Sequence, residues 1–263
     1  MAAQVRGHGS AGAQLARRER EPDPVLRRLP MAFWRSLPVL LVCGCALLAP
    51  TLLVGALFGA ESPLLALLVC AVGAPLLLVC IERLHAELFE REAGAGRRWW
   101  HRALRAEAIV LPCGLAAALS LIAAYAAAET GSAVFSIAAA AGALAALVLA
   151  LIAIVALPLC IARPEHTLRA IVLVACYALL RSPLPALAVA TVGSALAWFA
   201  MSGLPGLAAI APGLLAAFAV GAAWPTVVRA GVALPALSPF SPRSGTAPHP
   251  GRPSANSQQR STP

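Results

Sequence analysis

The positions of the basic residues constrain this chain more than any other feature. All 20 basic residues are arginine, and they alternate with long apolar runs in a regular way. Taken in order, the seven segments outside the apolar runs hold seven, none, six, none, three, none and four arginines: 1–36, 60–62, 82–107, 129–132, 162–183, 203–204 and 227–263. Arginine is retained on the cytoplasmic side of a bacterial membrane, so this alternation predicts six spans with both termini in the cytoplasm.

Composition and segment length support the same prediction. The chain is 60% hydrophobic and only 12% charged, and about 20 apolar residues suffice to cross the ~30 Å hydrocarbon core. Six segments are long enough, and none has an ionisable acidic or basic side chain in its interior: Leu37–Gly59, Pro63–Ile81, Ala108–Ala128, Ala133–Ile161, Leu184–Ser202 and Pro205–Thr226. The sequence therefore predicts an all-α integral membrane bundle over 34–230, with six transmembrane helices in three hairpins. The fourth span is overlong, and we expect it to tilt or to project beyond the membrane.

The segments that contain arginine are predicted to lie on the cytoplasmic side, and the short links 60–62, 129–132 and 203–204 on the external side. The polar stretches 1–33 and 231–263 have the composition of disordered tails. Residues 82–106 have the pattern of an amphipathic helix, interrupted by Gly94-Ala95-Gly96. The apolar stretch Ile171–Leu180 reaches only about 15 Å, half of the bilayer. Extending it into the next span would bury Arg181, so 165–182 is predicted to be an interfacial or a shallow re-entrant helix.

One basic and aromatic stretch is the candidate contact site for another protein or for lipid. Tryptophan interleaved with arginine is typical of the headgroup region of a membrane. The formal charge of +9 is therefore expected to face anionic lipid and not nucleic acid. The candidate residues are Arg97, Arg98, Trp99, Trp100, Arg102 and Arg105.

Small residues spaced four apart mark candidate helix-packing positions. Gly55 and Gly59 form one such step, and Ala138 and Gly142 form another. Both steps permit close helix approach, within the bundle in the first interpretation or between two copies of the chain in the second. Hydroxyl side chains inside the spans, such as Thr51 and Ser120, are expected to bond nearby backbone. Prolines inside the spans are expected either to kink the helices or to break them along a path.

Catalytic and metal-binding patterns are absent from the sequence. The seven cysteines form no CxxC pair and have no histidine at ligand spacing, so they are interpreted as small apolar packing residues. There is no GxSxG, HExxH or phosphate-binding loop. The sequence therefore predicts no cofactor, no metal and no enzymatic activity. The absence of ionisable groups from the spans also argues against an ion-driven carrier acting alone.

Three motifs, in their order along the chain, resemble the YesL-like family of small bacterial membrane proteins. The first is Arg35-Ser36-Leu37-Pro38, and the second is the stretch 97–102 described above. The third runs from Thr167-Leu168-Arg169-Ala170 to Arg181-Ser182-Pro183-Leu184. The resemblance covers roughly 33–230 and implies an accessory component associated with carbohydrate uptake, with no catalytic residues. The alternatives are an autonomous transporter of a neutral solute and, less favoured, a membrane-embedded enzyme.

Overall fold

The computed structural model describes residues 24–59, 62–89, 99–201 and 205–229. Within these residues 94% are helical and no strand is present. The predicted all-α fold is therefore confirmed. The seven helices are α2 (Pro24–Phe58), α3 (Pro63–Phe89), α4 (Trp99–Thr130), α5 (Ala133–Ala162), α6 (Leu168–Arg181), α7 (Leu184–Met201) and α8 (Pro205–Arg229).

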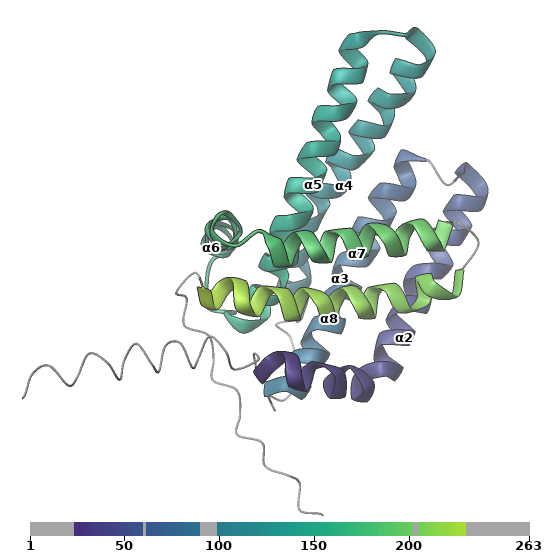
Figure 1. Ribbon diagram of the computed structural model, residues 1–263. Coiled ribbons are helices and arrows are strands. Elements are labelled where there is room, and N and C mark those ends of the chain that lie inside the picture. Colours follow the sequence, from purple (N-terminus) through teal and green to yellow (C-terminus); the bar gives the residue numbers. More distant parts are fainter. Residues whose placement is uncertain (1–23, 60–61, 90–98, 202–204, 230–263) are drawn as a thin grey trace, which may run out of the picture.

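Helices adjacent in sequence pack as three hairpins, α2–α3, α4–α5 and α7–α8. Figure 1 shows α3, α4, α5 and the upper part of α2 running in one general direction, with α7 and α8 lying across them. Two apolar clusters hold this arrangement together: one joins α2, α3, α4, α5 and α8, and the other joins α4, α5, α6, α7 and α8. Helices α4, α5 and α8 contribute to both clusters, so they link the two halves of the bundle.

Five helical segments are long and apolar enough to cross a membrane: Val25–Phe58, Pro63–Phe89, Trp99–Thr130, Ala133–Ala162 and Ala209–Val228. A sixth is obtained only if α6 and α7 are taken together, and these two helices are bent by 98° at their junction. The chain thus has the helices of a multi-pass membrane protein. Among the five, α8 is the most deeply packed, with 61% of its most apolar window buried against the rest of the chain.

Helix α2 begins at Pro24, so residues 24–33, which the sequence analysis placed in a tail, are helical. Proline lacks an amide hydrogen and kinks a helix interior, and α2 contains Pro30, Pro38 and Pro50. In Figure 1 the first part of α2 runs across the bundle and the helix then turns upward beside α3. The helices continue through their internal prolines, so prolines bend these helices without breaking them.

The α4–α5 hairpin projects beyond the end of the α2–α3 hairpin (Figure 1). Gly131 turns the chain at its tip with a φ of +65°, a conformation that a residue with a side chain rarely adopts. Large apolar side chains near the tip point outward, including Val134, which is 72% exposed, and Ile137, which is 70% exposed. This surface suits contact with lipid tails.

The predicted short helix in 165–182 is confirmed as a separate element, α6. Thr167 caps it by accepting a hydrogen bond from the backbone N–H of Ala170, and it ends at Arg181, just before Ser182-Pro183. Proline disfavours a helical conformation in the residue before it, which explains the sharp break ahead of α7. The amphipathic helix predicted in 82–106 is helical in both of its described parts, 82–89 and 99–106. Its first part continues α3 to Phe89 and its last part begins α4 at Trp99, while Gly94-Ala95-Gly96 and most of both predicted tails lie outside the described residues.

Candidate interaction site at the arginine-rich end

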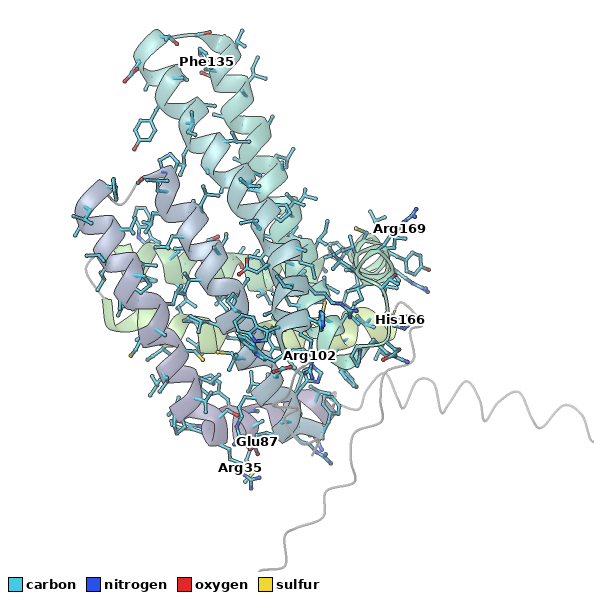
Figure 2. All side chains as sticks on the ribbon, turned by 180° about the vertical axis from the view of Figure 1, so that it is seen from behind. Arg35, Glu87, Arg102, Phe135, His166 and Arg169 are labelled. Carbon is cyan, nitrogen blue, oxygen red and sulfur yellow. The ribbon has the colours of Figure 1, made fainter. Side chains whose placement is uncertain are left out.

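Charged side chains gather at the end of the bundle opposite the α4–α5 tip, which we call the arginine-rich end. Figure 2 shows Arg35, Glu87 and Arg102 toward this end, far from Phe135 at the tip. Arg102 of α4 forms a hydrogen-bonded ion pair with Glu82 of α3, and both side chains are largely buried. This contact joins the first two hairpins. A part-buried ion pair that includes a hydrogen bond holds its geometry better than an exposed ion pair does.

Glu87 of α3 is shared by two arginines. Its carboxylate lies 3.1 Å from the guanidinium of Arg83, one helical turn away, and 4.0 Å from that of Arg35 on α2. The Arg35 side chain is 59% exposed, so this longer pair contributes little to stability. One acidic residue therefore neutralises only part of the local positive charge.

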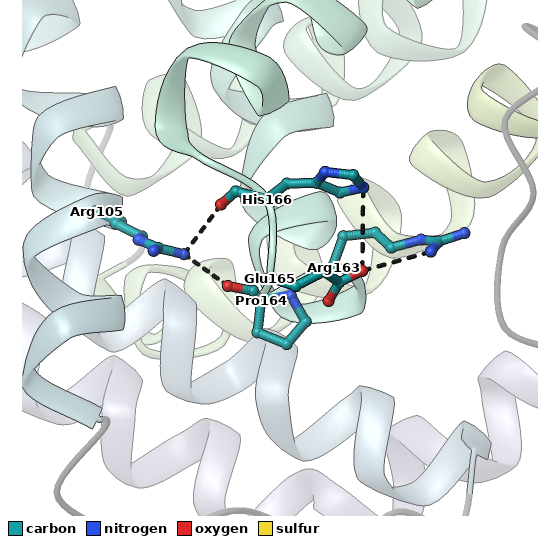
Figure 3. Close-up of polar contacts among 5 residues, drawn as sticks. All are labelled: Arg105, Arg163, Pro164, Glu165 and His166. Atoms are coloured by element: carbon teal, nitrogen blue, oxygen red, sulfur yellow. Dashed lines mark hydrogen bonds and ion pairs between the residues drawn. The ribbon is translucent and has the colours of Figure 1, made fainter.

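Arg105 fixes the connection between α5 and α6 (Figure 3). Its Nη1 donates to the carbonyl oxygens of Pro164, at 3.0 Å, and His166, at 3.3 Å. In the same loop, Glu165 lies 3.4 Å from Arg163 and 4.0 Å from His166. The pKa of Glu165 is lowered, first by a hydrogen bond from its own backbone N–H and then by its contacts with Arg163 and His166. Polar contacts thus hold the α5–α6 loop: Arg105 binds its backbone carbonyls, and Glu165 contacts Arg163 and His166 within it.

Within the predicted contact stretch, some described side chains contact their own chain and others are exposed. Arg97 and Arg98 lie outside the described residues. Trp99 is half-buried against the first apolar cluster, whereas Trp100 is 69% exposed, and the two rings meet edge to face at 4.8 Å. Arg102 and Arg105 contact their own chain, as described above. Of the described candidates, Trp100 is therefore the residue most available to a partner or to lipid.

The four candidate packing residues differ in what surrounds them. Gly142 faces Ser120 across the α4–α5 interface, where an added Cβ would lie 3.0 Å from the Cβ of Ser120. Ala138 is exposed, and it is Ala139 whose carbonyl accepts from Ser120 Oγ at 2.7 Å. An added Cβ at Gly55 would meet nothing within 4 Å, and Gly59 ends α2 with a φ of +85°. Packing within the chain is thus confirmed for Gly142 and not for Gly55, Gly59 or Ala138.

Helix α8 uses close approaches that the spacing pattern did not single out. A Cβ on Gly44 of α2 would overlap the backbone carbonyl of Ala209, and one on Gly213 would lie 2.9 Å from the Cβ of Leu40. Between α3 and α4, a Cβ on Gly114 would lie 2.7 Å from the Cβ of Cys70. Gly44 has no small residue four positions away, and although Gly213 and Gly114 do have alanines at that spacing, the spacing does not say which helix each one approaches, so only the structure identifies these contacts.

Four of the seven cysteines form two pairs across helix interfaces, whereas Cys45 is exposed. The Cys43 thiol is a hydrogen-bond neighbour of Cys80, and Cys70 is a neighbour of Cys113, whose thiol also donates to the carbonyl of Ala146 at 3.3 Å. No group of three or more His, Cys, Asp or Glu side chains that could hold a metal occurs in the part of the chain that the structure describes.

A buried aromatic cluster lies where α3 meets α8. His85, which lies in the segment predicted to form an amphipathic helix on the cytoplasmic side, is only 7% exposed. Its ring stacks on Phe89 at 4.9 Å, and Phe89 in turn lies 5.0 Å from Trp224. His85 and Trp224 also line a small, mainly apolar cavity. The cavity has none of the converging polar groups that define a substrate site.

Polar side chains within the spans bond the backbone, as predicted. The hydroxyls of Thr51, Thr191 and Ser194 each donate to a carbonyl three or four residues earlier in the same helix. Such bonds satisfy the hydroxyl's donor hydrogen within its own helix. No family model, no curated protein and no solved structure matches the chain.

Proposed function

We propose that the chain is a multi-pass protein of the bacterial inner membrane that acts as an accessory component of a solute transport system, with a carbohydrate as the expected solute. Both termini are proposed to lie in the cytoplasm. The observation that carries the proposal is the separation of apolar and charged material. The predicted spans contain no ionisable acidic or basic side chain, while the ion pairs of the described residues gather at one end.

This separation supports a helper role because a bundle without ionisable groups has no evident means of coupling ion movement to transport. The arginine-rich end offers instead a rigid surface. Arg102 and Arg105 brace the start of α4 against α3 and the α5–α6 loop, and Trp100 stands exposed beside them. Aromatic and arginine side chains on a braced surface are the residues most often found at protein contacts. A permease or another membrane protein is the proposed partner, with a second copy of the chain as a further possibility.

The test is crosslinking in native membranes followed by affinity purification of the full chain. We expect a permease or a solute-binding protein to be recovered. Replacing Arg97 and Arg98 together with Gln should reduce this recovery, and Arg102 is left intact because it pairs with Glu82. The matched control is Arg169→Gln with Arg181→Gln, which removes the same charge from α6. If the purified chain alone moved a neutral sugar into liposomes, the accessory role would be wrong and an autonomous transporter would replace it.

A further inference from the structure

The first part of α2, residues 24–36, has two distinct faces. Val25, Ala32 and Ser36 are at most 5% exposed and recur at helical spacing on the side packed into the bundle. Gly221 of α8 marks one point of contact, since a Cβ placed there would lie 3.3 Å from Leu29. The segment is therefore a docked helix, and its opposite face is fixed in position by this packing.

The outward face combines arginine with large apolar side chains. Trp34 is 70% exposed and Met31 is 54% exposed. Arg27 is exposed one to two turns before them, and the Arg35 side chain is 59% exposed. At 100° per residue, Arg27 and Trp34 fall close to the centre of this face, directly opposite the buried residues.

Positive charge prevails around this face. The described residues of α2 and the end of α3 contribute four arginines, Arg27, Arg28, Arg35 and Arg83, and two acidic residues, Glu82, which pairs with Arg102 of α4, and Glu87. Glu87 is already shared by Arg35 and Arg83. The surface is therefore complementary to an anion. Its exposed apolar side chains also favour a partner that has an apolar part next to its negatively charged group.

We propose that the exposed face of residues 24–36 binds anionic phospholipid headgroups at the membrane surface. Trp34 and Met31 enter the apolar boundary of the bilayer, and Arg27 and Arg35 meet the phosphates. At the headgroup level of a membrane, tryptophan contacts the apolar boundary while arginine beside it meets the anionic groups, so both residue types suit one face of a helix that lies in the interface. The first part of α2 runs across the direction of α4 and α5 (Figure 1), the orientation that such a helix needs if α4 and α5 cross the bilayer.

The experiment measures lipid binding to the full chain, purified in detergent, by native mass spectrometry with phosphatidylglycerol and with phosphatidylcholine as probes. We expect preferential binding of phosphatidylglycerol, weakened by raising the salt concentration. Arg27→Gln with Arg35→Gln should weaken phosphatidylglycerol binding about 30-fold, which corresponds to about 1 kcal/mol for each arginine. Phosphatidylcholine binding should not change. The single variant Arg27→Gln, which leaves the contact between Arg35 and Glu87 intact, should weaken phosphatidylglycerol binding about 5-fold.

The control is Arg169→Gln with Arg181→Gln, which removes the same charge from exposed positions on α6. An equal loss in the control and in the α2 variant would mean that net charge and not this face binds the lipid. Equal affinity for the two lipids, or unchanged binding in the Arg27→Gln variant, would also overturn the proposal. So would binding of an acidic peptide or nucleic acid at this face that phosphatidylglycerol does not displace.

Discussion

The approach of α8 to α2 makes a sharp prediction about two glycines of one helix. Gly44 and Gly55 both lie in α2, but a Cβ at Gly44 would overlap the backbone carbonyl of Ala209, whereas a Cβ at Gly55 would meet nothing within 4 Å. Substitution of each by alanine adds the same single methyl group. The two variants therefore separate the effect of helix packing from that of helix propensity.

Alanine favours a helix over glycine by about 0.8–1 kcal/mol, which gives Gly55→Ala a neutral or slightly stabilising effect. Gly44→Ala gains the same helix propensity. Its added methyl group would meet the backbone carbonyl of Ala209, which cannot rotate away as a side chain can, so α2 and α8 must separate. Overpacking of this kind costs about 1–3 kcal/mol, and the separation also loosens the neighbouring contact between Leu40 and Gly213. We expect Gly44→Ala to be less stable than Gly55→Ala by about 2 kcal/mol.

The assay is thermal unfolding of both variants in detergent, followed by size-exclusion chromatography of the heated samples. A difference of about 2 kcal/mol corresponds to a midpoint about 4–8 °C lower for Gly44→Ala in a domain of this size. Wild-type chain measured in the same detergent sets the reference. Equal midpoints for the two variants, or a lower one for Gly55→Ala, would refute the predicted packing of α8 on α2.

Three further predictions follow from other contacts. Gly114→Ala should destabilise the chain by about 1–3 kcal/mol through its clash with the Cβ and Sγ of Cys70, and Cys70→Gly in the same chain, which removes both atoms, should restore part of this loss in the same unfolding assay. Arg102→Gln should lower stability by about 1–3 kcal/mol because it leaves the part-buried Glu82 without its partner, whereas a double change to Gln at both positions should cost less; equal losses would contradict the pairing. Reporter fusions should read as external after Glu61, Glu129 and Gly203, and as cytoplasmic after Arg98, Arg169 and Arg243; an external reading at Arg98 would contradict the arginine alternation.

The arginine alternation predicts the same side of the membrane for both termini whether or not the α7–α8 hairpin crosses the membrane. A hairpin returns the chain to the side from which it departed, so 162–183 and the residues after Arg229 share a side in either case. The arginine alternation is satisfied equally by both arrangements, because 203–204 contains no arginine. The reporter fusion after Gly203 therefore decides whether this hairpin, which lies across α4 and α5 in Figure 1, crosses the bilayer.

Hydrophobic length and helix-breaking residues alone determined the helical class and most of the boundaries. The predicted span Ala133–Ile161 differs from α5 by one residue, and the predicted spans beginning at Pro63, Leu184 and Pro205 start where α3, α7 and α8 do. These limits are local, since they depend on where an apolar run meets Gly, Pro or a charge. The separate α6 was predictable for the same reason, because it is too short to span and Pro183 follows it.

The tertiary structure decided which side of each helix meets another helix. Ala138 and Gly142 match a packing pattern, yet Ser120 bonds Ala139, and Gly55 packs against nothing within the chain. In helices that are apolar all round, no hydrophobic stripe marks the inward face, so rotation and partner choice depend on shape complementarity between distant segments. Arg102 and Arg105 show the same limit for charge. Whether an arginine faces lipid, a partner or its own chain depends on where Glu82 and the α5–α6 carbonyls lie after folding, and local sequence does not contain that information.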